Sequence, residues 1–138
     1  KLSIIVFSGS FDRVHYALAT ASAAAATNIA VTLFFTMGAI RALTNDDNGE
    51  PRWGELMHSE STADGVSCDS IHKTSGVAGF EELLEACVAL KVKFLVCEMG
   101  LRAAGFGVDT LRDDVPIEQG GLVTFLADAD ANGSMLFI

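Results

Sequence analysis

KLSIIVFSGSFDRVHYALATASAAAATNIAVTLFFT, residues 1–36, is the stretch that decides the fold class, because it predicts two buried strands separated by one helix. Residues 1–8 and 29–36 are nearly continuous in apolar and β-branched side chains. Strands covered on both faces of a sheet have this pattern. Residues 13–27 are rich in alanine, which favours a helix that packs closely on a sheet. Asp12 is predicted to be the N-cap of that helix.

The rest of the chain continues this alternation of strand and helix. Helices are predicted at residues 37–43, 79–90, 100–106 and 121–131, and strands at residues 92–97, 115–117 and 134–138. In the helix at 121–131, Leu122, Phe125, Leu126 and Ala129 are expected to face the core. The order predicts one α/β domain over residues 1–138 with three α/β/α layers and a mostly parallel sheet of about five strands, of the flavodoxin-like or Rossmann-like type.

Residues 45–75 interrupt the alternation with many turn-forming side chains and little periodicity. We expect a long polar excursion there, and loops of such length are usually functional or disordered. Cys68 lies in this segment and is expected to be exposed. Trp53 also lies there, and its sequence context leaves open whether it packs locally or marks a contact with a partner.

The composition excludes several classes of protein. With 9 basic and 18 acidic residues the formal charge is −9, so phosphate backbones are repelled and nucleic acid is not an expected partner. No apolar run approaches the ~20 residues that span a bilayer, and the apolar part of residues 1–7 is too short for a signal peptide. Three irregularly spaced cysteines do not form a disulfide framework. They indicate a reducing compartment, and the cytoplasm is the predicted location.

No motif in the chain requires a metal or an organic cofactor. His58, Cys68 and His72 are the strongest metal-ligand candidates, but no fourth ligand accompanies them. The turn at residues 8–10 follows a strand and precedes a helix, as phosphate-binding loops do. It lacks the glycine and lysine pattern of nucleotide-binding loops. We therefore expect neither a metal site nor a cofactor.

Cys97 is the candidate catalytic residue, because it ends the predicted strand at 92–97 just before a helix begins. Ligands of parallel α/β sheets bind beyond the carboxyl ends of the strands. Free amide groups at a helix start would stabilise a thiolate and favour nucleophilic chemistry. The alternative, that Cys97 is only a small buried hydrophobic residue, stays open.

Five further residues are predicted to bind substrate around this thiol. Ser8 and Thr36 end neighbouring predicted strands, so they are expected at the same edge of the sheet. Met37 and Met99 are candidates for an apolar mouth, and Gly100 belongs to the start of the helix after Cys97.

Three segments carry a family resemblance: VTLFFTMGAIRAL (31–43), FEELLEACVALKVKFLVCEMG (80–100) and GGLVTFLADADANGSMLFI (120–138). Together they resemble the DsrE/DsrF-like family of small sulfurtransferases and sulfur carriers. The resemblance implies a three-layer α/β/α fold and a homo-oligomer such as a trimer or hexamer. It also implies a cysteine that carries sulfane sulfur as a persulfide, and the matching position is Cys97 within LVCEMG.

The sequence thus predicts a persulfide-carrying sulfurtransferase that takes sulfur from a donor protein or small sulfane compound and passes it to another thiol. Two alternatives stay open. One is a non-catalytic oligomeric binding module of the same fold. The other is a thiol redox protein in which Cys68 resolves an oxidised Cys97.

Overall fold

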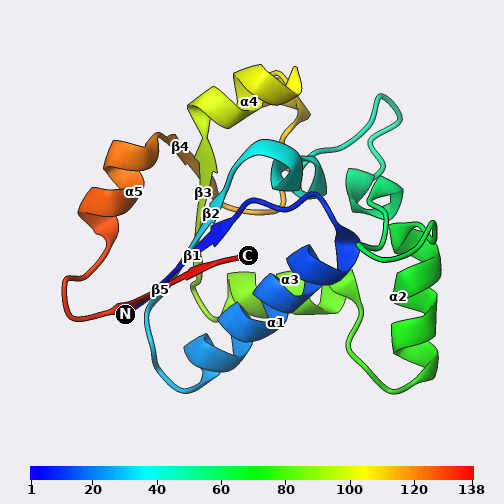
Figure 1. Ribbon diagram of the computed structural model, residues 1–138, viewed down its shortest axis with the longest axis horizontal. Helices are drawn as coiled ribbons and strands as arrows, with labels where there is room; N and C mark the ends of the chain where they lie inside the picture. The colour runs from blue at the N-terminus through cyan, green and yellow to red at the C-terminus, as the bar shows by residue number, and fades with distance from the viewer.

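The centre of the molecule is a five-stranded parallel sheet, seen in a computed structural model that describes residues 1–138 (Figure 1). Its strands are β1 (Leu2–Val6), β2 (Val31–Phe35), β3 (Lys93–Cys97), β4 (Ile117–Gly120) and β5 (Ser134–Phe137). They lie in the order β4-β3-β2-β1-β5, and every neighbouring pair is parallel. The predicted fold class is confirmed.

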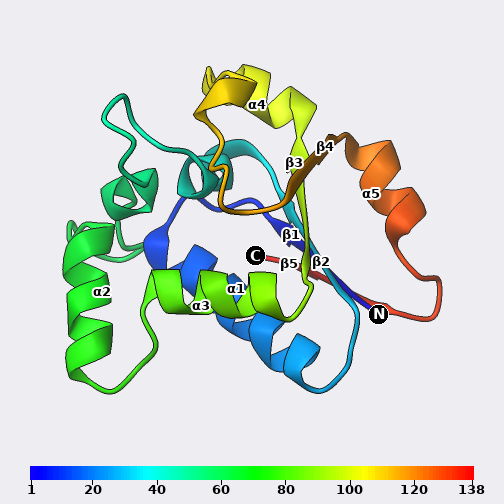
Figure 2. The ribbon, with the colours of Figure 1, turned by 180° about the vertical axis from the view of Figure 1, so that it is seen from behind.

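Helices cover both faces of the sheet, as Figures 1 and 2 show from opposite sides. The chain moves outward from β1 to β4 and then returns to the other side of β1. Because crossovers between parallel strands are right-handed, this reversal places α1 (Phe11–Ala26) and α3 (Phe80–Ala89) on one face and α5 (Leu122–Asp128) on the other. The larger core lies under α1 and α3 and includes Ile4 and Leu33.

Helix α1 begins earlier than the sequence predicted. Ser10 is its N-cap residue, and Asp12 lies in the first turn, so the prediction of Asp12 as the N-cap was wrong. The helix begins early because Phe11 is fully buried and packs in the larger core. The carboxylate of Asp12 instead accepts hydrogen bonds from the backbone N–H and the hydroxyl of Ser59, at 2.8 and 2.6 Å.

The segment 45–75 is more ordered than its composition suggested. It contains the 3-10 helix η2 (Arg52–Glu55) and the α-helix α2 (Gly65–Thr74), and it follows the 3-10 helix η1 (Met37–Leu43). The side chain of Asp64 caps α2 by accepting a hydrogen bond from the Ser67 backbone N–H. Cys68 is only 7% exposed, so the prediction that it is exposed was wrong. Cys68 lies on the face of α2 that packs against the larger core, and it is therefore buried.

Trp53 packs locally. Its indole ring stacks on Phe80 at a centroid distance of 4.8 Å, and its Nε1–H donates to Glu81. The ring therefore holds η2 against the start of α3, which favours the packing interpretation of this residue.

The short helix α5 is less buried than predicted. Phe125 is fully buried and stacks on Phe34 at 4.8 Å, whereas Leu122 and Leu126 are 47% and 56% exposed. The prediction that both leucines face the core was wrong, because α5 is the only helix on its face of the sheet and its flanks stay exposed.

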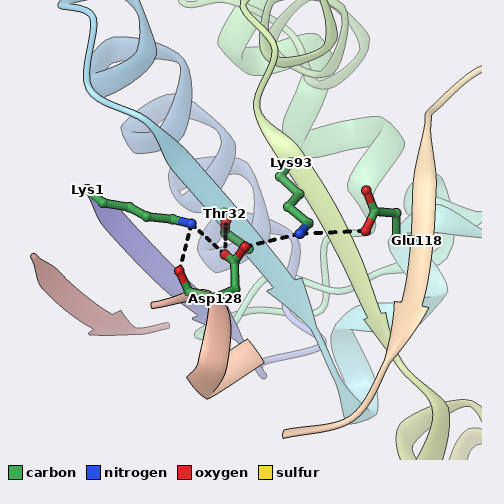
Figure 3. A network of polar contacts seen from close by, with 5 residues as sticks. All are labelled: Lys1, Thr32, Lys93, Glu118 and Asp128. Carbon is green, nitrogen blue, oxygen red and sulfur yellow. Dashed lines mark hydrogen bonds and ion pairs between the residues drawn. The ribbon is translucent and has the colours of Figure 1, made fainter. Parts of the chain in front are cut away.

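A polar network joins the end of α5 to the strands beneath it (Figure 3). The Asp128 carboxylate accepts hydrogen bonds from Lys1 Nζ at 2.6 Å, Thr32 Oγ1 at 2.7 Å and Lys93 Nζ at 3.0 Å. Lys93 also pairs with Glu118 at 3.6 Å. Desolvation alone would raise the pKa of Asp128, but these donors together hold it well below its usual value.

The connection from β3 to β4 contains α4 (Glu98–Ala104) and the 3-10 helix η3 (Val108–Thr110). Helix α4 lies beside η1 at the carboxyl edge of the sheet (Figure 1). None of the helices has the length and apolar content needed to cross a membrane.

Candidate functional site

Cys97 is the last residue of β3 and also the N-cap of α4. Its Sγ accepts a hydrogen bond from the Gly100 backbone N–H at 3.4 Å. Free amides at the first turn of a helix carry partial positive charge, so the Gly100 N–H is an electrostatically favourable partner for the sulfur atom. The structure therefore places the thiol at the strand-to-helix junction where the sequence expected it.

The sulfur is nevertheless enclosed. Cys97 is 1% exposed and packs in a small cluster with Phe34, Leu95 and Phe125 on the face covered by α5. Across the ladder it pairs with Gly120, two residues before α5 begins. Any reagent that reaches the sulfur must therefore displace part of its surroundings.

Thr36, Met37 and Gly100 lie together beside Cys97. A Cβ atom on Gly100 would come within 2.9 Å of the Met37 backbone nitrogen and 3.1 Å of Thr36 Oγ1. Only glycine allows α4 to lie this close to the end of β2. Met37 has a positive φ of 48°, which turns the chain sharply at this point. Thr36 and Met37 thus lie against Gly100, whose amide contacts the sulfur.

Ser8 and Met99 lie further out. Ser8 follows β1, and its hydroxyl accepts a hydrogen bond from the Ser10 backbone N–H at 3.2 Å. Met99 is more than half exposed on α4, so its side chain does not shield the sulfur. The point where strand order reverses lies between β1 and β5, whereas β3 is two strands away from β1. Cys97 is therefore at the carboxyl edge of the sheet but away from the switch point.

The other two thiols are held in their protonated form. Cys87 is fully buried, donates to the Leu18 carbonyl, and has its pKa raised to about 12 by burial. Burial also raises the pKa of Cys68, with further contributions from the carboxylates of Asp12 and Asp64. Cys97 is thus the one thiol with a helix-start amide as its partner.

Cys68 packs in the larger core under α1 and α3, on the opposite face of the sheet from the cluster around Cys97. A disulfide between the two would require the chain to rearrange, and this arrangement weakens the interpretation of Cys68 as a resolving thiol.

The histidines of segment 45–75 form no metal centre. His72 stacks on His15 at a centroid distance of 4.4 Å, and His58 lies 3.9 Å from Asp12 Oδ2. No three His, Cys, Asp or Glu side chains of the chain converge in a way that could hold an ion.

Sequence reasoning missed a cavity of about 280 Å³ between η1 and the end of α4. Its lining includes Met37, Arg41 and Phe106. Arg41 follows closely after β2 in a chain with few basic residues, and this position could have indicated that Arg41 belongs to a binding site. Nothing in the sequence around Phe106 indicates that it lines a cavity, since only folding brings it beside Arg41.

The fold and the position of Cys97 define a small parallel α/β protein with a helix-capping cysteine at the carboxyl edge of its sheet. The chain belongs to the DsrE/DsrF-like family, whose model matches residues 1–132. It is 28% identical to the uncharacterized protein YrkE of Bacillus subtilis (strain 168), a similarity that covers the whole of this chain and 96% of the relative.

Two solved structures share the fold. One is a protein of unknown function, MTH1491 from Methanobacterium thermoautotrophicum, with a TM-score of 0.58 and 12% identity over 99% of this chain and 97% of that one. The other is the ychN protein from E. coli, with a TM-score of 0.56 and 18% identity over 100% of this chain and 99% of that one. At these identities the similarity concerns the architecture alone.

Proposed function

We propose that this protein is a sulfur-relay protein that carries sulfane sulfur on Cys97 as a persulfide. The observation that carries the proposal is the contact between Cys97 Sγ and the Gly100 amide at the start of α4. Membership of the DsrE/DsrF-like family supports it. Burial raises the pKa values of Cys68 and Cys87, so neither of these thiols is a ready competing nucleophile.

The chemistry needs only thiols. The Cys97 thiolate attacks the outer sulfur of a donor persulfide, R–S–SH. The S–S bond of the donor breaks, R–S⁻ leaves with the bonding electron pair, and Cys97–S–SH forms with no net oxidation or reduction. An acceptor thiolate then takes the outer sulfur in the same way and regenerates the Cys97 thiolate. The Gly100 amide stabilises the inner sulfur in both states.

We further propose that the partners are persulfide-bearing donors and thiol acceptors in the cytoplasm, where cysteines stay reduced. A homo-oligomer such as a trimer or hexamer is part of this proposal. It is supported by the exposed apolar side chains of α5 and β5, which a second copy of the chain would cover.

Mass spectrometry after incubation with a sulfane donor tests the assignment. Wild-type protein should gain one sulfur, and this gain should disappear in Cys97→Ser. Cys68→Ser is the matched control and should load as wild type does, because its thiol lies in the opposite core. If Cys97→Ser takes up sulfur at the wild-type level, the assignment to Cys97 is wrong.

The enclosed position of Cys97 favours a second candidate, an oligomeric binding module in which the cysteine is structural. On this hypothesis wild-type protein takes up no sulfur from any donor. Cys97→Ala would then lose stability through the cavity it creates, with no other change in behaviour.

A further inference from the structure

The cavity between η1 and α4 combines apolar walls with one cationic side chain. Its volume is about 280 Å³, close to the lower limit of small-molecule sites. Met37 and Gly38 form one side, and Ala103, Ala104 and Phe106 form the other. The guanidinium of Arg41 lies over the Phe106 ring, 5.8 Å from its centroid, and also lines the cavity.

The charge of Arg41 is not neutralised by the protein. Arg41 takes part in none of the ion pairs of the structure. Arg52 lies over the same ring at 5.8 Å, but its guanidinium pairs with Glu55 at 3.2 Å. In a chain with a formal charge of −9, an unpaired guanidinium held by an aromatic ring at a cavity is a distinct place for an anion.

The cavity is joined to the candidate site through Met37. The backbone nitrogen of Met37 lies beside Gly100, whose amide contacts Cys97 Sγ, and Met37 also lines the cavity. The cavity lies at the C-terminal end of α4, beside Ala103 and Ala104, so a ligand seated there must extend along α4 past Met37 to reach the enclosed sulfur. This arrangement separates a recognition end, at Arg41, from a reacting end, at Cys97.

We propose that this cavity binds the carboxylate-bearing body of a low-molecular-weight persulfide and that Arg41 determines specificity for its negative charge. The proposal rests on the sulfur-relay function and names the class of its donor. The apolar walls suit an aliphatic body, and the Arg41 guanidinium suits a carboxylate. Transfer follows the balanced step given above: the donor loses its outer sulfur to Cys97 and leaves the cavity as a thiolate.

Binding is tested with S-methylglutathione, a thioether that carries carboxylates but has no reactive sulfur. Its diethyl ester, in which both carboxylates are converted to uncharged esters, is the comparison ligand. Titration followed by backbone amide NMR should shift the signals of Met37, Gly38 and Phe106. Arg41→Gln should weaken binding of the dicarboxylate by at least about fivefold, the loss of one charge-assisted contact. The diester should bind wild type as weakly as the dicarboxylate binds the variant.

Arg102→Gln is the matched control. Arg102 is an exposed arginine of α4 that neither forms an ion pair nor lines the cavity. The Arg102→Gln substitution should change the affinity for S-methylglutathione by less than about twofold. Equal weakening by both substitutions overturns the proposal, because it indicates only a general effect of net charge. No shift at the cavity residues also overturns it, because the ligand then does not bind there.

A second measurement separates this inference from the proposed function. Inorganic polysulfide, which needs no carboxylate recognition, should load Cys97 equally in wild type and Arg41→Gln, whereas glutathione persulfide should load Arg41→Gln more slowly. If polysulfide loads Cys97 but S-methylglutathione does not bind, the cavity proposal fails alone. If no donor loads Cys97, the relay function fails, and the donor class proposed for this cavity fails with it.

Discussion

At the scale of single residues, Gly100 connects the sheet edge to the thiol. Its amide donates to Cys97 Sγ, and its Cα lies where a methyl group would contact Ile40 Cδ1 at 2.7 Å and the Met37 nitrogen at 2.9 Å. The Met37 contact involves backbone, which does not yield as a flexible side chain does. The glycine is thus required by packing, and the position of the amide depends on it.

Gly100→Ala should therefore lower the free energy of unfolding by about 1–3 kcal/mol, the usual cost of overpacking, and slow sulfur loading of Cys97. Urea denaturation and the rate of mass gain measure the two effects. Gly121→Ala is the control, because a Cβ there meets nothing within 4 Å. A similar loss in both variants would contradict the packing argument.

Cys87 is predicted to stay unmodified in the folded protein. Burial raises its pKa to about 12, so almost none of it is thiolate at pH 8, and its side chain is fully buried. Site-specific alkylation with iodoacetamide at pH 8 should leave Cys87 free, while in 8 M urea, a denaturing concentration, all three thiols should react at comparable rates. Rapid labelling of Cys87 without denaturant would show that its core opens readily.

The residue scale also shows how far the sequence could predict the site. The position of Cys97 followed from a buried strand that ends before a helix, which is local information. The burial of Cys68 did not follow, because a contact between α2 and the core decides it. The pairing of Arg41 with Phe106 was equally out of reach, since it depends on how η1 and α4 pack together.

At the scale of elements, α5 covers the cluster that contains Cys97. The helix contributes Phe125 to the cluster around the sulfur, and its end is fixed by the three donors of Asp128. Few other contacts hold this seven-residue helix to the sheet. Loosening the Asp128 end should therefore expose the sulfur without disturbing α4.

Asp128→Asn is expected to lower stability by about 2 kcal/mol, as for other hydrogen bonds to charged groups, and to speed alkylation of Cys97. Glu118→Gln serves as the control, because Glu118 pairs with Lys93 at 3.6 Å and is largely exposed, so its contribution is small. Unchanged Cys97 labelling in Asp128→Asn would show that access to the sulfur runs by another route.

The same carboxylate gives a pH dependence with a defined sign. The pKa of Asp128 is lower in the folded protein than its ordinary value of 3.8, so the ionised form stabilises the fold. This contribution is fully present above pH about 5 and is lost as the pH falls below about 4. The stability difference between wild type and Asp128→Asn should thus be constant from pH 7 to 5 and shrink in more acidic solution. A difference that grows on acidification would reverse the assigned sign.

The elements themselves were largely predictable, whereas their exposure was not. Runs of apolar residues located β1, β2 and β3, and the spacing of Leu84 and Cys87 located α3. The same reasoning wrongly predicted that Leu122 and Leu126 face the core. Apolar spacing shows that a helix has an apolar face, but it does not show what covers that face.

At the scale of the whole molecule, the two faces of the sheet are unequally covered. Helices α1 and α3 cover one face, and only α5 covers the other (Figures 1 and 2). The edge strand β5 is exposed along its length, and Phe137 on it is 67% exposed. Exposed edge strands and apolar helix flanks of this kind are typical of surfaces that pair with another chain.

Val123 is the most sensitive position for testing self-association, because it is 83% exposed on α5 and makes little contribution to the core of its own chain. Val123→Glu should leave the fold intact and shift the molecular mass in solution from that of an oligomer towards that of a single chain, since a buried carboxylate at an interface is costly. Light scattering coupled to size exclusion measures this shift. Ile71→Glu is the control: Ile71 is 64% exposed on α2, far from α5 (Figure 1), and its substitution should leave the mass unchanged. An oligomer that survives Val123→Glu, or wild-type protein that runs as a single chain, would mean that the α5 surface does not mediate self-association.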